Sequence, residues 1–180
     1  KPGDTLAFIV FRDGTQTNVN VEVANFKAKQ MLVPFYEYGK QPSYFVTGGY
    51  VFQKLTRNYF ALWGDNWSGK VPPHLYQYYS NNAFNPSEER QDIVILSYVL
   101  PAPINLGYQD LGRLVVSTWN GMKIHSFSDI EKARQLNPGD PFDVIEFELN
   151  SPKIVIPRQN IVQYDAQIGQ IYGITSLKNI

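Results

Sequence analysis

The chain has 180 residues, 43% of them hydrophobic, and its 16 Lys and Arg balance 16 Asp and Glu. This neutral balance gives no electrostatic attraction to nucleic acid or to an anionic membrane surface, so we expect neither as a partner. There is no cysteine for a disulfide or a thiol nucleophile, and no apolar run reaches the roughly 20 residues of a membrane span. The composition predicts a protein with an ordinary hydrophobic core.

Two segments of the chain are similar to each other. Residues 1–23 read KPGDTLAFIVFRDGTQTNVNVEV, and residues 137–159 read NPGDPFDVIEFELNSPKIVIPRQ. Each has Pro-Gly-Asp, an apolar strand, a hairpin turn (Asp13-Gly14 or Asn150-Ser151) and a second strand. A predicted helix precedes the second copy only. We therefore expect residues 1–26 to be the last two strands of a preceding, truncated domain; the alternative is chance similarity of two hairpins.

Residues 27–40 show no clear period and are expected to form a linker to a second domain, residues 41–180. The first element of that domain is a strand-like stretch, residues 44–55, which contains Gly48 and Gly49. Adjacent glycines are entropically costly in a strand. They are usually kept where the backbone turns sharply or approaches another group closely.

The next segment predicts two helices rich in aromatic residues. Residues 55–67 predict a helix that Thr56 can cap, and residues 71–82 predict a second helix with prolines in its first turn. The aromatic residues of this segment are Tyr59, Phe60, Trp63, Trp67, Tyr76, Tyr78 and Tyr79. They are expected to pack the helices over a sheet, to form an interface, or to form a sugar-stacking platform. The candidate interface residues are Tyr59, Trp63, Trp67, Tyr76 and Tyr79.

The remaining elements are mostly strands. Residues 92–100 form the most apolar strand, and residues 112–124 predict a hairpin about Asn120-Gly121. Residues 126–137 predict a helix with a capping box of Ser128 and Glu131. Its apolar face is predicted from Phe127, Ile130, Ala133 and Leu136, which recur at helical spacing. The last segment, residues 165–174, predicts a short helix and a strand. The fold class is therefore α+β.

The ordered set of these elements resembles a PDZ domain of the HtrA/Deg serine protease family. The resemblance rests on YFVTGGYVFQKLT, VLPAPINLGY and WNGMKIHSFSDIEKA, at residues 44–56, 99–108 and 119–133. More narrowly, the chain is similar to the C-terminal PDZ-like region of plant-type Deg proteases. The resemblance implies a partly open β-barrel or sandwich with flanking helices and a helical insertion. It also implies a regulatory region for a protein quality control protease whose catalytic domain lies upstream.

In PDZ domains, amides of a loop before one strand hold a peptide's C-terminal carboxylate, and the peptide adds beside that strand as a further strand. Oriented backbone N–H groups suit an anion, and side chains would obstruct it. The residues that the resemblance assigns to peptide binding are Gly48, Gly49, Tyr50, Val51 and Phe52 on the loop and strand, and Phe127, Ile130, Ala133 and Arg134 on the facing helix. The alternative is that Gly48-Gly49 is only a tight bend and that the groove is closed.

The resemblance implies two roles, binding of a protein or peptide and assembly of the protease into a homo-oligomer, of which we favour assembly. The rival classes are a carbohydrate- or protein-binding β-rich module unrelated to proteases, and a stand-alone hydrolase. For a bacterial protein the family would imply the periplasm or cell envelope; the sequence does not otherwise indicate a compartment.

Other motifs do not support an enzyme. Residues 64–70, GDNWSGK, have P-loop spacing, but Val71 stands where a Ser or Thr is needed, and no strand precedes them. No Gly-Asn-Ser-Gly-Gly loop is present, and His74 and His125 lack a Ser–Asp setting or the cysteines of a zinc site. The acidic residues Asp65, Glu88 and Glu89 are typical of surface loops rather than of a glycosidase pair. We therefore expect no catalytic residue, metal or cofactor.

Overall fold

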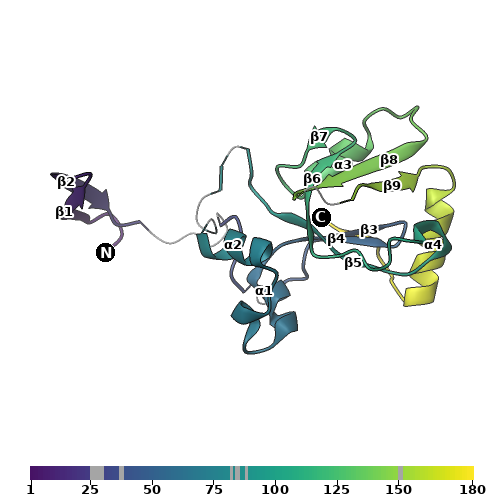
Figure 1. Ribbon diagram of the computed structural model, residues 1–180, viewed down its shortest axis with the longest axis horizontal. Coiled ribbons are helices and arrows are strands. Elements are labelled where there is room, and N and C mark those ends of the chain that lie inside the picture. The colour runs from purple at the N-terminus through teal and green to yellow at the C-terminus, as the bar shows by residue number, and fades with distance from the viewer. Residues whose placement is uncertain (25–30, 37–38, 82, 84–85, 88, 150–151) are drawn as a thin grey trace.

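The structure is a computed structural model that describes residues 1–24, 31–36, 39–81, 83, 86–87, 89–149 and 152–180. It consists of an N-terminal β-hairpin and an α+β body, which confirms the predicted class (Figure 1). The expected turn at Asn150-Ser151 and the candidate acid Glu88 lie outside the described residues.

The hairpin joins β1 (Thr5–Arg12) to β2 (Thr15–Glu22) in antiparallel register. Its turn residues, Asp13 and Gly14, have φ angles of 51° and 77°, as the predicted two-residue turn requires. Nearly every residue of both strands is exposed. An isolated two-stranded hairpin is only marginally stable in water.

The body is built on one antiparallel sheet. Its strands are β3 (Tyr44–Thr47), β4 (Tyr50–Lys54), β5 (Val94–Val99), β6 (Leu114–Trp119), β7 (Met122–Lys123), β8 (Phe142–Phe147), β9 (Ile154–Pro157) and β10 (Lys178–Asn179). The strand order is β10-β3-β4-β5-β6-β8-β9, with β7 paired to β6. Because this path ends at β10 and β9, the described strands form an open sheet rather than a closed barrel.

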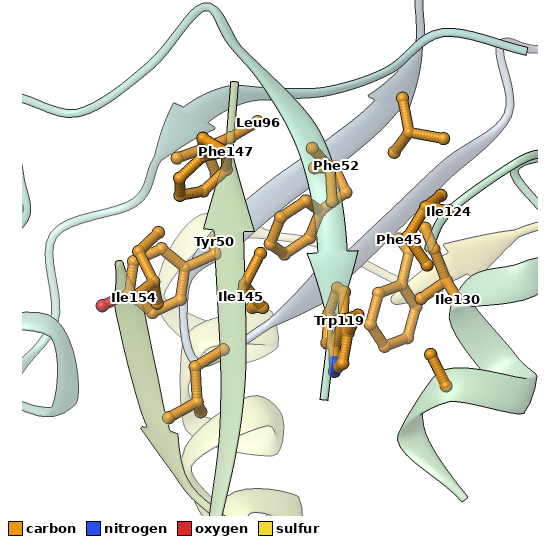
Figure 2. Packing of buried hydrophobic residues seen from close by; sticks show 14 of the residues in the cluster. Phe45, Tyr50, Phe52, Leu96, Trp119, Ile124, Ile130, Ile145, Phe147 and Ile154 are labelled. Atoms are coloured by element: carbon orange, nitrogen blue, oxygen red, sulfur yellow. The ribbon is translucent and has the colours of Figure 1, made fainter. Parts of the chain in front are cut away.

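The main core lies between this sheet and helix α3 (Asp129–Arg134). Trp119 is fully buried at its centre, with ring centroids 5.0 Å from Phe52 and 6.2 Å from Phe45 (Figure 2). Ile130 and Ala133, three residues apart on α3, are both fully buried in the same cluster. The predicted apolar face of this helix is therefore the face that closes the core.

A second core joins the aromatic segment to the sheet. Helix α2 (Pro73–Asn81) packs with α1 (Arg57–Phe60) and the 3₁₀ turns η2 (Ala61–Trp63) and η3 (Trp67–Gly69). The fully buried centre of this second core contains Leu55, Phe60, Leu75, Ile93 and Ile95. Residues 31–33 are also buried there, so part of the expected linker belongs to the domain core. We call residues 56–81 the insert.

A polar cluster joins the last helix of the insert, α2, to Glu148, the residue that follows β8. The Tyr78 hydroxyl on α2 donates to Glu148 at 2.8 Å, and Arg90 donates to the same carboxylate at 2.6 Å. Burial, aided by the hydrogen bond to Glu148, raises the pKa of Tyr78 to about 12. The phenol therefore stays protonated at neutral pH and remains a donor.

Three local predictions were wrong. Residues 44–55 form two strands, not one, because the glycine pair makes a hairpin turn. The helix expected over residues 55–67 is one α-turn and two 3₁₀ turns, since Gly64, at φ 72°, breaks it. The Ser128–Glu131 capping box is absent; instead the Asp129 carboxylate accepts from the backbone N–H of Ser126 at 2.9 Å.

The predicted C-terminal elements are present in altered form. Helix α4 spans Ile161–Tyr172, longer than the short helix expected, and begins after Asn160, which has a left-handed φ of 60°. The strand that follows is β10, which pairs with β3. This pairing returns the end of the described chain to the start of the body.

Candidate functional site

The Gly48-Gly49 turn, singled out by the sequence, joins β3 to β4. Thr47 pairs with Tyr50 across it, so the loop has two residues. Their φ angles are 56° and 82°, and two successive positive values are those of the type I′ hairpin turn. Glycine adopts this conformation without the steric cost that other residues incur.

Asn105 comes very close to this turn. Its side-chain Nδ2 donates to Gly48 O and to Leu100 O, each at 2.8 Å, and Leu100 N donates to Gly49 O at 2.7 Å. A Cβ atom on Gly49 would lie 2.4 Å from both Asn105 Nδ2 and Leu100 O. Gly49 is therefore needed for space as well as for its backbone angles.

Asp165, on α4, binds the turn from another side. Its carboxylate accepts a hydrogen bond from Gly48 N at 2.6 Å and one from the Thr47 hydroxyl at 3.0 Å. Burial raises the pKa of Asp165, although these two hydrogen bonds and the charge of Arg134 oppose the rise. The Asp165 carboxylate thus accepts the hydrogen bond from the Gly48 amide, the group that the PDZ resemblance assigns to a peptide's carboxylate.

The expected groove between β4 and α3 contains β3. β4 pairs with β5 along one edge and with β3 along the other. On α3, the Arg134 guanidinium lies 4.9 Å from the ring centroid of Phe45, a β3 residue. Beside β3, Lys178 of β10 forms an ion pair with Glu131 of α3 at 2.6 Å. An antiparallel strand of the chain therefore lies where an added peptide would pair.

The other residues assigned to peptide binding divide between two environments. Tyr50, Phe52, Phe127, Ile130 and Ala133 are buried together in the main core. Val51 lies on the opposite face of β4, and Arg134 lies at the rim of a cavity of about 390 Å³. The opposite charges along this cavity are largely paired, since Arg158 donates to Asp143 at 2.8 Å.

The candidate interface aromatics lie together around the second core, and all are half-buried. The Trp67 ring stacks on Phe60 at 5.4 Å with an interplanar angle of 7° and meets Tyr79 edge-on at 5.3 Å. The Arg57 guanidinium lies 3.8 Å from the centroid of Trp67. These rings therefore have a packing role whether or not they also form an interface.

Sequence reasoning missed Asn105 and Asp165, the two side chains that hold the turn. Both are buried polar residues, which need hydrogen-bond partners. Asn105 is 57 residues from Gly48 and Asp165 is 117 residues away. No local pattern marks either, although a lone Asp in the otherwise uncharged segment that forms α4 is a weak signal.

Comparison with known proteins gives the family. The family model described as PDZ domain matches residues 33–178. The chain belongs to the PDZ domain family. Three relatives from Arabidopsis thaliana match it: putative mitochondrial protease Do-like 3 (28% identical, covering 73% of this chain and 21% of the relative), putative mitochondrial protease Do-like 12 (24%, 87% and 26%) and chloroplastic protease Do-like 2 (29%, 82% and 23%).

The resemblance to a PDZ region of the HtrA/Deg proteases is thereby confirmed, and the chain spans about a quarter of the length of these relatives. Among the described residues, no helix is long and apolar enough to cross a membrane. The same residues contain no cluster of three His, Cys, Asp or Glu side chains suited to a metal ion.

The two glycines should differ in their tolerance of alanine. Gly48→Ala adds a Cβ 3.3 Å from a methyl of the buried Ile156, a tight contact without a clash, so its cost is mainly the left-handed backbone, about 1–2 kcal/mol. Gly49→Ala adds a clash with the Leu100 carbonyl and Asn105 and should cost about 3 kcal/mol or more. Urea unfolding of both variants measures this, and equal costs would contradict the close approach at Gly49.

Asp165 should make the folded state more stable in mild acid than at neutral pH. Because its folded pKa is raised, the folded chain binds the proton more readily than the unfolded chain. Its contribution to folding stability therefore falls as pH rises from about 3.9, the ordinary Asp pKa, to the raised value.

Asp165→Asn keeps an acceptor for Gly48 and should remove this pH dependence. Asp165→Ala leaves Gly48 N–H and the Thr47 hydroxyl buried without a partner, and should cost about 1–3 kcal/mol at any pH. Chemical unfolding across the acidic range, with the exposed Asp140→Asn as control, measures both effects. An Asp165→Asn variant with the unchanged pH slope of the parent would refute this assignment.

Proposed function

We propose that this chain is the non-catalytic regulatory PDZ region of an HtrA/Deg-type serine endopeptidase, and that it acts mainly in assembly of copies of that protease. Peptide hydrolysis then belongs to another part of the parent protein. The observation that carries the proposal is the pairing of β4 on both edges, with Asp165 on the Gly48 amide. A region with this closed arrangement is better suited to stable contacts than to capture of free peptide ends.

Opening the groove would have a large cost. A peptide that adds to β4 must release β3, which pairs with it from Tyr44↔Gln53 to Thr47↔Tyr50. It must also take Phe45 out of the main core and separate Asp165 from Gly48. Each buried polar group left without a partner costs about 1–3 kcal/mol. These costs oppose peptide addition unless the incoming peptide makes equivalent strand pairing, core contacts and hydrogen bonds.

The insert is the proposed assembly surface. It is the segment that distinguishes this domain from an ordinary PDZ domain, and it gathers half-buried Trp and Tyr rings, which are enriched at protein interfaces. At its surface Leu62 is 76% exposed, beside the partly exposed Trp63. The second core holds this surface in place, so a partner would meet a preformed face.

C-terminal peptide binding is the second candidate. The Gly48 amide already holds a carboxylate, that of Asp165, so its geometry suits a carboxylate ligand. In this alternative, a peptide end replaces Asp165, and the peptide strand replaces β3. Peptide binding would then depend on release of β3 from β4.

The N-terminal hairpin is proposed to complete the sheet of a preceding PDZ domain. Phe8 faces Val19 and Leu6 faces Val21 across the two strands, so this face of the hairpin is apolar in the part away from the turn. Such a face is normally buried against a core. Residues 1–26 would then belong to that domain, residues 27–40 to the connection, and residues 41–180 to the present domain.

Sedimentation velocity tests the assembly surface. Leu62→Asp places a charge on the proposed surface and should weaken self-association of the parent protease by at least about tenfold, as loss of a central interface contact does. The control is Leu106→Asp, outside the insert and 72% exposed, which should not change association. Both variants should melt as the parent does. Equal association of all three proteins would refute the insert as the assembly surface.

A further inference from the structure

A second groove lies on the opposite face of the sheet from the main core, between β4, β5 and the insert. Its volume is about 450 Å³. Its lining comprises Val51, Gln53, Tyr59, Leu62, Trp63, Ser97, Tyr98 and Arg113. Tyr98 is 58% exposed, so its ring is available to a ligand. This groove is separate from the closed one between β4 and α3.

A β-bulge shapes this groove. Val51 pairs with Tyr98 and Phe52 with Leu96, so Ser97 has no direct partner in the register. The Ser97 hydroxyl donates to Val51 O at 3.0 Å. Bulges of this kind redirect side chains and are over-represented beside functional sites. Here the bulge places Ser97 and its neighbour Tyr98 in the lining of the same groove.

Arg113 has a strained backbone that the neighbouring elements hold. Its φ is 61°, a left-handed value that is uncommon for a side chain of this size. His74 Nε2, from the insert, donates to Arg113 O at 2.8 Å. On its other side, a Cβ on Gly112 would lie 3.2 Å from Ser97 O, so the chain runs close to β5 here. Strain that surrounding contacts hold in place often marks a functional position.

The Arg113 guanidinium has no ion pair among the described residues. It lies 5.7 Å from the centroid of Trp63, and the other residues that line the groove are uncharged. By contrast, Arg90 and Arg158 both pair with carboxylates. A planar guanidinium held over an aromatic ring is suited to bidentate pairing with a carboxylate.

We propose that this groove binds an extended acidic peptide segment of a protein partner. An apolar side chain of the segment packs against Trp63 and Tyr98, and a neighbouring Asp or Glu pairs with Arg113. The charge of Arg113 in an otherwise uncharged, aromatic-lined groove supports this choice of ligand. The groove shares Leu62 and Trp63 with the insert, whereas Tyr98 and Arg113, the two residues that the variants below test, lie outside it.

An array of immobilised octapeptides tests the proposal on the unaltered chain. Each peptide carries Leu or Phe beside Glu and is paired with a copy in which Gln replaces Glu. The acidic copies should be retained about tenfold better, which is the typical effect of a charge-assisted hydrogen bond. If no acidic peptide is retained better than its Gln copy, the proposal is wrong, and this result requires no variant of the protein.

Two substitutions assign the effect to the groove. Arg113→Glu should abolish the preference for acidic peptides and favour copies with Lys, whereas Arg12→Glu, on the exposed hairpin, should change nothing. Tyr98→Ala should weaken all retained peptides about tenfold without altering the Glu-over-Gln ratio. If Arg113→Glu and Arg12→Glu retain the same peptides, or if Tyr98→Ala has no effect, the site lies elsewhere and the proposal fails.

Discussion

The hydrogen bonds around the Gly48-Gly49 turn are the constraint on which the rest of the body depends. Asn105 and Asp165 fix the turn from two separate segments, and the turn sets the register of β3 on β4. That register directs Phe45 into the main core beside Trp119. A different turn would change which residues of β3 face inward, since side chains alternate along a strand. The closed groove therefore follows from the turn.

β5 connects this closed groove to the insert. Val94 and Leu96 face the main core, and Ile93 and Ile95 face the second core. A strand covered on both faces needs the nearly continuous apolar run that the sequence has here. Both cores therefore share one central strand, and the groove at Arg113 lies beside it.

The predictable parts of the fold are those encoded locally. The Asn120-Gly121 hairpin, the apolar face of α3 and the strand at residues 92–100 were expected from turn chemistry and periodicity. The position of the glycine pair marked the candidate site, but its occupants could not be deduced, because Asp165 meets Gly48 across 117 residues. Periodicity likewise does not indicate whether both edges of a strand are paired, so a closed groove was one of two alternatives and its closure by β3 could not be deduced.

Hydrogen exchange of the β3 and β4 amides tests most directly whether the groove is closed by the chain itself. If β3 is a permanent member of the sheet, amides of residues 44–54 exchange as slowly as those of β5, through global unfolding. Addition of peptides with free C-terminal carboxylates then leaves their rates unchanged. Exchange of residues 44–54 much faster than β5, together with protection on adding such peptides, would contradict the account and show a groove that opens for ligands.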